Sequence, residues 1–190
     1  MDQPIPEDDA LIGQVRECFA RVVYTHKTHE KQADICARTL TRFKIAQIVL
    51  AAVTTSGTLT ILFTEDFWLK LITAVVSLVT LILSGYMKGF DPGATAQKHR
   101  DTAADIWAIR ESYLSLLTDM QAKAISHDLA RERRDNLQSS LAAIYKSAPG
   151  TTSRAYRRAQ MALQKLEDYT FNDGEVDKFL PSALKRDGIR

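Results

Sequence analysis

The stretch FKIAQIVLAAVTTSGTLTILFTEDFWLKLITAVVSLVTLILSGY, residues 43–86, decides the fold of this chain. It contains two apolar runs, residues 45–63 and 67–86, joined by a short polar link. Each run is about 20 residues long, and a helix of that length crosses the roughly 30 Å hydrocarbon core of a bilayer. Since so short a link makes the two helices antiparallel, we predict a transmembrane hairpin. Two buried helices of a soluble bundle are the alternative, but the polar flanking chain offers too little apolar surface to cover them.

The distribution of charge predicts how the hairpin sits in the membrane. The 190 residues carry a net charge of +2, but every Lys and Arg except Lys70 lies before residue 45 or after residue 86. The link carries only Glu65 and Asp66. By the positive-inside rule, both termini should be cytoplasmic and the link should be outside. The first ten residues, MDQPIPEDDA, are acidic and unlike the start of a signal peptide.

These features divide the chain into three parts. We predict an N-terminal cytosolic helix over residues 1–44, the transmembrane hairpin over 45–86, and a cytosolic helical region over 87–190. The predicted fold class is an all-α membrane protein, in which a two-helix transmembrane hairpin is joined to long cytosolic helices that form a helical bundle.

The two flanks of the hairpin have the apolar spacing that is typical of packed helices. Asp8 and Asp9 are expected to cap the first helix, which should run on into the first span as one rod. An Asp-Pro-Gly turn at residues 91–93 should break the chain, and a second long helix should follow from Ala94. The two rods should pair antiparallel through one assembly seam, which consists of Val15, Val22, His26, His29, Ile109, Tyr113, Leu117 and Met120. Residues 137–145 should either continue this second helix or form a third one, and further helices are expected over 153–169 and over 174–180.

Polar side chains follow one face of each predicted span. The stripe in the second span consists of Thr73, Ser77, Thr80 and Ser84, and the stripe in the first span includes Gln47, Thr54 and Thr58. Small hydroxylated residues let membrane helices approach closely and hydrogen-bond to each other, so the stripes can face each other inside one hairpin. Alternatively, they can face the shared axis of an oligomer and line a pore. The pattern leaves both interpretations open.

Side chains suited to catalysis or metal binding are few. His26 and His29 lie three residues apart, but no Cys or carboxylate completes a metal site by spacing, so packing in the seam is the simpler interpretation. If one helix carries Cys18 and Cys36, they are too far apart for a disulfide. The chain has no Gly-rich phosphate loop, nucleophile elbow or CxxC pair. We therefore predict neither an enzyme nor a cofactor.

Two basic clusters remain as candidates for ligand binding. The first consists of Arg131, Arg133 and Arg134, and the second of Arg154, Arg157 and Arg158. Such clusters can hold the phosphates of a nucleotide, an RNA or anionic lipid headgroups. The simpler interpretation is that they are solvated faces that add solubility.

Three segments of the chain resemble a known family. They are RVVYTHKTHEKQADICARTLTRFKIAQIVLAAVTTSGTL, YMKGFDPGATAQKHRDTAADIWAIRESYLSLLTD and YRRAQMALQKLEDYTFNDGEVDKFLP. Together they are similar to the SLATT domain, the SMODS and SLOG-associating two-transmembrane effector domain. The resemblance rests on helix patterning and on the motifs HKTHEK, TTSG and AQKHRD. It implies a bacterial membrane effector of an anti-phage conflict system, linked with SMODS nucleotidyltransferases and SLOG ligand-sensing domains, and it implies no catalytic residue.

Two functions from different classes fit these features. In the first, several copies assemble in the bacterial inner membrane and form a pore or disrupt the membrane during abortive infection, because one hairpin cannot enclose a water path. The lipid bilayer and further copies of the chain are then its partners. We expect no sensor domain to be fused to this chain, so the resemblance implies that a separate sensor, a nucleotide second messenger or a nucleic-acid-linked enzyme is the trigger. In the second function, the chain is a membrane-anchored scaffold that recruits a soluble partner and conducts nothing.

Overall fold

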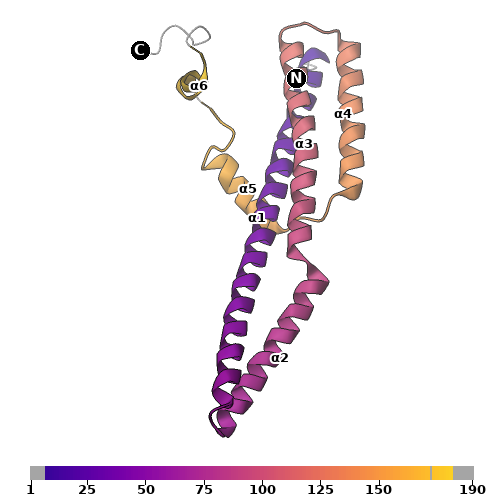
Figure 1. The fold of residues 1–190 in the computed structure, drawn as a ribbon. Coiled ribbons are helices and arrows are strands. Elements are labelled where there is room, and N and C mark those ends of the chain that lie inside the picture. Colours follow the sequence, from indigo (N-terminus) through magenta and orange to yellow (C-terminus); the bar gives the residue numbers. More distant parts are fainter. Residues whose placement is uncertain (1–6, 172, 182–190) are drawn as a thin grey trace, which may run out of the picture.

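The computed structural model describes residues 7–171 and 173–181, and every regular element in them is a helix. In chain order the helices are α1 (Glu7–Ile61), α2 (Phe67–Phe90), α3 (Pro92–Gln121), α4 (His127–Ser147), α5 (Ser153–Gln164) and α6 (Asp173–Phe179). Figure 1 shows that α1 and α2 form a hairpin at one end of an elongated molecule, while α3, α4 and α5 gather around the other half of α1. We call this second part the distal bundle. The predicted all-α hairpin with a helical bundle is confirmed.

One helix, α1, runs through both parts of the molecule. Its 55 residues contain no proline, and at about 1.5 Å per residue it is roughly 80 Å long. The predicted continuous rod is therefore present. The expected cap is wrong, because the helix already begins at Glu7 and thus places Asp8 and Asp9 inside its first turn.

The hairpin turn is held by its polar link. Asp66 caps α2 by accepting a hydrogen bond from the backbone N–H of Leu69 (3.0 Å), and Lys70 Nζ lies 2.6 Å from Glu65 Oε2. The helical conformation of α1 ends at Ile61, and that of α2 extends to Phe90, beyond the predicted end of the second run.

A sharp turn separates α2 from α3. Asp91 has a φ of 21°, and its side chain accepts hydrogen bonds from the N–H groups of Gly93 and Ala94, both at 3.0 Å. Pro92 occupies the first helical position, where its missing N–H costs nothing. The Asp-Pro-Gly break was predicted correctly, but α3 begins at Pro92, two residues before the expected Ala94.

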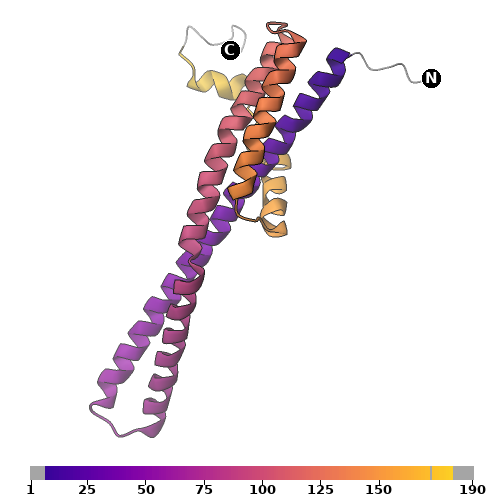
Figure 2. The same ribbon diagram turned by 90° about the vertical axis from the view of Figure 1, so that its right-hand side faces the viewer.

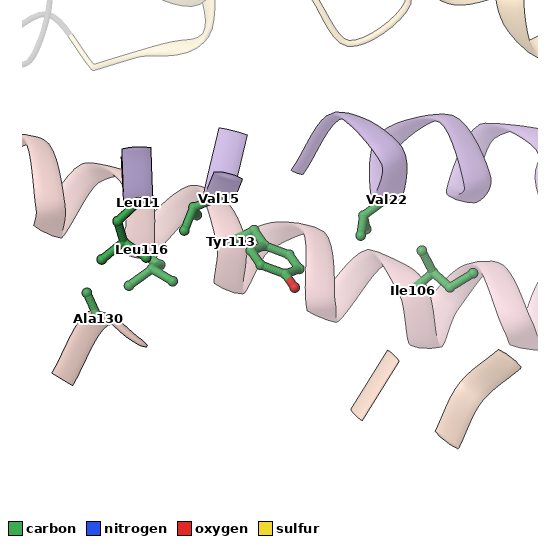
Figure 3. Close-up of a cluster of buried hydrophobic side chains, with 7 residues drawn as sticks. All are labelled: Leu11, Val15, Val22, Ile106, Tyr113, Leu116 and Ala130. Carbon is green, nitrogen blue, oxygen red and sulfur yellow. The ribbon is translucent and has the colours of Figure 1, made fainter. Parts of the chain in front are cut away.

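The distal bundle is built on an antiparallel pair of helices, α1 and α3. Figure 3 shows how their buried side chains meet: Val22 lies opposite Ile106, and Tyr113 lies beside Val15. Both valines, Ile106 and Tyr113 are fully buried. At the end far from the hairpin, Leu11 and Leu116 meet Ala130 of α4, which closes the core.

Two further helices cover the α1–α3 pair from different sides (Figure 2). α4 lies along α3, and α5 packs on α1 through Ala155, Ala159 and Ala162, all buried. The expected helix over residues 153–169 is too long, because α5 ends at Gln164 and an irregular segment follows. α6 spans Asp173–Phe179, and the expected cap residue Asn172 lies outside the described residues.

The two hairpin helices approach closely at Gly57. A Cβ atom added there would collide with Oγ1 of Thr73, so only a residue without a side chain fits. Small residues allow such contacts between membrane helices.

We predict that Gly57→Ala destabilises the hairpin by about 1–3 kcal/mol, because the added methyl group overpacks the contact. The double variant Gly57→Ala/Thr73→Ala should recover most of this loss, since the colliding side-chain atoms are gone. Gly85→Ala is the matched control, because a Cβ atom at Gly85 meets nothing within 4 Å. Thermal unfolding in detergent measures the differences. Equal melting temperatures for Gly57→Ala and Gly85→Ala would contradict the close approach.

Candidate functional site

The outer surface of the hairpin is apolar and uncovered. In the most apolar 18-residue window of the first span no residue is buried, and in that of the second span 6 % are buried. Exposed side chains on it include Ile48, Val53, Leu62, Leu78 and Leu81. Two helices of this length and composition can cross a membrane, and their exposed apolar surface needs lipid or protein around it.

The structure divides the predicted polar stripes between two environments. Thr73 is only 9 % exposed and lies against Gly57, and Thr54 and Thr80 are half-buried. Gln47 Nε2 donates a hydrogen bond to Ser84 Oγ (3.2 Å), so the two stripes also meet at the end of the hairpin near Asp91.

The other members of the stripes remain on the surface. Ser77 and Thr58 are exposed, and Ser84 is exposed although it is bonded to Gln47. The hydroxyl of Thr80 donates to the carbonyl of Val76 at 2.8 Å, as threonines in membrane helices commonly do.

A buried polar layer lies inside the distal bundle, on the side of the hairpin. His29 of α1 and His99 of α3 are 4 % and 1 % exposed, and their Nδ1 atoms are 3.1 Å apart. A hydrogen bond at this distance requires one ring to carry a proton on Nδ1 and the other to accept it. Both rings must then be neutral or share one added proton, because two imidazolium rings would repel each other.

Burial explains the protonation of this pair. Burial, reinforced by the nearby His99 and His26, lowers the pKa of His29 to about 4. It also lowers the pKa of His99. The two rings are therefore neutral at pH 7.

A second polar cluster joins three segments of the chain around the ring of Tyr169. Its hydroxyl donates to Glu30 Oε2 at 2.6 Å, and His26 Nδ1 lies 3.2 Å from the hydroxyl oxygen of Tyr169. Two cations lie over the ring: Lys27 Nζ is 4.2 Å and Arg110 Cζ is 4.7 Å from its centroid. We call this arrangement the Tyr169 clamp.

Ion pairs complete the Tyr169 clamp. Lys27 Nζ lies 3.0 Å from Glu30 Oε2 and 2.9 Å from Asp168 Oδ2, although its side chain is only 8 % exposed. Burial alone would lower the pKa of Lys27, but the hydrogen bonds to Asp168 and Glu30 outweigh it and raise that pKa. Burial likewise opposes the charge on Glu30, yet the bonds from Tyr169 and Lys27 hold its pKa below the ordinary value. Both groups are therefore charged at pH 7.

The same environment shifts the two remaining groups of the clamp. Burial and the bond to Glu30 raise the pKa of Tyr169 to about 12, so its hydroxyl keeps the proton that it donates. Burial lowers the pKa of His26, which Arg110 and Lys27 reinforce and Glu30 opposes. Because the tyrosine proton points to Glu30, the nitrogen of His26 must donate to the phenol oxygen.

The predicted seam residues lie at the interface between α1 and α3 of one chain. Val15, Val22 and Tyr113 are fully buried, and His26 and His29 are nearly so. The remaining three, Ile109, Leu117 and Met120, are partly buried against the core.

The predicted basic clusters differ in their partners. Arg133 pairs with Asp119 at 2.8 Å, and Arg134 contacts Asp135 and also Gln14 of α1. Arg131 Nη1 is 3.8 Å from Asp128. On α5, Arg154 and Arg157 are exposed and Arg158 is half-buried. The first cluster thus helps to hold α4 in place, whereas the second presents its charge to solvent.

The sequence pattern missed the Tyr169 clamp. Its members Lys27, Arg110 and Tyr169 come from three segments, and the Glu30–Tyr169 bond joins residues 139 positions apart. One local signal was present: a lysine and a glutamate three residues apart beside a seam histidine. In the described residues, no group of three or more His, Cys, Asp or Glu side chains is placed to hold a metal ion, and both cysteines are free.

Two helices long and apolar enough to cross a membrane, joined to a helical bundle with a buried polar layer, are the arrangement expected of a two-span α-helical membrane protein. The comparison with known families makes this specific. The family model described as "SMODS and SLOG-associating 2TM effector domain family 4" matches residues 11–175. The chain belongs to this family of effector domains with two transmembrane helices, which are associated with the SMODS and SLOG components of conflict systems. No curated protein and no solved structure matches the chain significantly.

We predict that acid destabilises the distal bundle through the histidine pair. The pKa of His29 is about 4 in the folded chain and about 6.5 when unfolded, so the unfolded chain binds the proton more readily. The stabilisation is complete above pH 6.5 and is lost as the pH falls toward 4. Lowering the pH from 7.5 to 5 should reduce the free energy of unfolding by up to about 2 kcal/mol, measured as faster backbone hydrogen exchange in α1 and α3.

The variant His29→Gln should weaken this pH dependence, because it removes one of the buried histidines that titrate. Gln121→Ala, at an exposed position without a titratable group, is the control and should leave the dependence unchanged. An unaltered pH dependence in His29→Gln would show that another group is responsible.

Proposed function

We propose that the chain is a membrane effector. Several copies of it assemble in the bacterial inner membrane, and the assembly forms a pore or otherwise breaks the permeability barrier. A separate sensor or signal, such as a nucleotide second messenger, triggers it, and the infected cell is lost before phage can multiply. The observation that carries this proposal is the apolar hairpin without any cover, in a chain that belongs to a family of two-span effectors.

The size of the hairpin supports assembly. Two helices cannot enclose a water path, so a pore requires several copies around a shared axis. The exposed part of the polar stripes, which includes Ser77 and Thr58, is the face that we assign to the water path. Thr73 and Thr80 lie near Ser77 on α2, and we expect them to border the path where neighbouring hairpins meet.

The distal bundle supports reception of the signal. The exposed guanidinium groups of Arg154 and Arg157 suit the phosphates of a nucleotide, a nucleic acid or lipid headgroups. α5 thus presents positive charge on the part of the molecule that lies outside the hairpin.

One observation favours the second candidate function, a membrane-anchored scaffold. Gln47 bonds to Ser84, and Thr73 fills the notch at Gly57, so much of the polar stripe is already used inside one hairpin. A scaffold needs only this packing and no water path.

Dye release from liposomes separates the two functions. Purified full-length chain in dye-filled vesicles should release the dye once assembled, for example above a threshold protein-to-lipid ratio or with the activated host system present. A scaffold would release no more dye than empty vesicles in every one of these conditions, and that result would overturn the effector proposal.

The assigned water path predicts how Ser77 variants conduct. An ionised side chain facing lipid near the bilayer centre costs roughly 2.5–3.5 kcal/mol, whereas in a wet lumen it costs much less. Ser77→Asp should therefore insert normally and shift the reversal potential toward cations, while Ser77→Leu should lower conductance by dewetting the lumen. Val79→Leu, on the exposed apolar face, is the control. Unchanged conductance and selectivity in both Ser77 variants would place this residue away from any lumen.

The charge distribution predicts the orientation in the cell. A cysteine at Glu65, in the exposed link, should react with a membrane-impermeant thiol reagent added to spheroplasts. A cysteine at the exposed position Lys146 of α4 should react only after the membrane is opened. Cys18 and Cys36 are replaced by serine in both variants. The reverse labelling pattern would contradict cytoplasmic termini.

A further inference from the structure

The segment between α5 and α6 is tied to the bundle by one side chain. Residues 166–170, which we call the strap, form no helix and cross the α1–α3 pair. Tyr169 supplies most of the contact, since its hydroxyl bonds to Glu30 and its ring lies under Lys27 and Arg110. Asp168 adds the ion pair with Lys27. The strap thereby connects α5 and α6 to both long helices.

The strap has an unfavourable backbone. Glu167 has a φ of 53° and Tyr169 has a φ of 75°, both in the left-handed region that side chains other than glycine disfavour. Two such residues within three positions persist only where surrounding contacts hold them, and they occur preferentially at switches and binding sites. The Glu167 side chain is exposed, so no buried contact of this side chain accounts for its strained backbone.

The clamp also leaves one buried donor unsatisfied. Arg110 Nη1 is buried and has no hydrogen-bond partner among the described residues, although Nη2 pairs with Glu111 at 2.7 Å. A buried N–H group without a partner disfavours the state that contains it. The closed strap therefore combines strong charge-assisted bonds with two separate sources of destabilisation, as expected of an element that can open.

Open space flanks the clamp on both sides. A cavity of about 620 Å³ lies beside His26 and Lys27 and is bordered by Trp107. Another, of about 490 Å³, lies between Leu114 and the strap itself, where Asp168 and Tyr169 form part of its wall. Movement of Tyr169 would therefore open a longer groove along α1 and α3.

Besides the strap, small side chains and a few specific contacts hold α5 to the bundle, among them the stacked rings of Tyr24 and Tyr156. The buried face of α5 consists of three alanines, which bury little area each. At its start Thr152 donates to Gln32 Oε1 at 2.7 Å, and near its end Gln164 bonds to the hydroxyl of Tyr24 at 2.7 Å. Loss of the strap would thus loosen the end of α5.

We propose that the strap is a latch: closed around Tyr169 it holds α5 and α6 on the α1–α3 pair in the resting chain, and it opens when the effector is activated. The part of this inference that concerns activation rests on the proposed function. The latch itself is a property of the single chain and can be measured without any membrane leakage.

Two substitutions should shift the latch in opposite directions. Tyr169→Phe keeps the ring but loses the bond to the Glu30 carboxylate, so the strap should open about tenfold more often. Glu167→Gly removes the strain at φ 53° without removing a contact, so the strap should open severalfold less often. Tyr156→Phe is the control for the first variant, because this half-exposed tyrosine stacks on Tyr24 through its ring. Glu167→Gln, which keeps the strain, is the control for the second.

Hydrogen exchange of the full-length chain in detergent, followed by mass spectrometry, measures opening as amide exchange in the strap and α5. The expected order of exchange is Tyr169→Phe fastest, wild type with both controls intermediate, and Glu167→Gly slowest. Wild-type exchange in Tyr169→Phe, or a shift of both test variants in the same direction, would overturn the latch.

Dye release from liposomes then tests what the latch controls. Tyr169→Phe should release dye at a lower protein-to-lipid ratio than wild type, and Glu167→Gly at a higher one. If exchange follows the expected order but no variant ever releases dye, the effector function is wrong and the latch stands. If the exchange order fails while wild type releases dye, the latch is wrong and the effector function stands.

Discussion

The continuity of α1 is the constraint on which the rest of the structure depends. One helix of 55 residues forms half of the hairpin and one side of the distal bundle. Inside a bilayer, backbone N–H and C=O groups must find their partners within the helix, so α1 cannot unwind cheaply in its membrane half. Outside the membrane, α3 and α5 pack along it. A tilt or rotation of the distal half is consequently passed to the hairpin without a flexible joint, whereas the other connection, at Asp91, is a sharp turn. The connection between hairpin and distal bundle through α1 is therefore a continuous helix, whereas the connection from α2 to α3 is interrupted by a turn.

Most of the fold was predictable from the sequence because it depends on periodicity. The two apolar runs, the break at residues 91–93 and the pairing of Val22 with the second rod all follow from spacing along a helix. Helix ends were less predictable. Apolar and small residues continue past Gln164, yet α5 ends there and the chain turns with positive φ at Glu167 and Tyr169. Tertiary contacts to α1 and α3 compensate for the free-energy cost of that backbone conformation, and these contacts cannot be predicted from the local sequence.

The candidate sites show the same division. The polar stripes of the hairpin were visible as patterns, but which members would be covered depended on how α1 and α2 cross. That crossing is set by Gly57 and Thr73, a pair that single-helix periodicity cannot connect. The Tyr169 clamp was even less predictable from the sequence, since its side chains come together only in the structure in which α5 packs on α1. His26 and His29 were assigned to the seam, and they do lie there, but their partners Tyr169 and His99 could not be identified from spacing.

The packing of the hairpin in one chain is compatible with a water path between several chains. Successive residues of an α-helix are rotated by about 100°, so Ser77 and Thr80, three positions apart, point only about 60° away from each other. A modest rotation of α2 would thus bring Thr80 to the surface. The Thr80 hydroxyl bonds to the carbonyl of Val76 in its own helix, and that bond turns with the helix and is not lost. Among the described residues, the interhelical hydrogen bond that must break is the one between Gln47 and Ser84, and Thr73 must also leave its contact with Gly57. Both partners of that bond are polar groups, which water in a lumen would solvate. The free-energy cost of separating them is therefore small only if water enters. In the proposed pore, opening of the path would thus be coupled to its hydration.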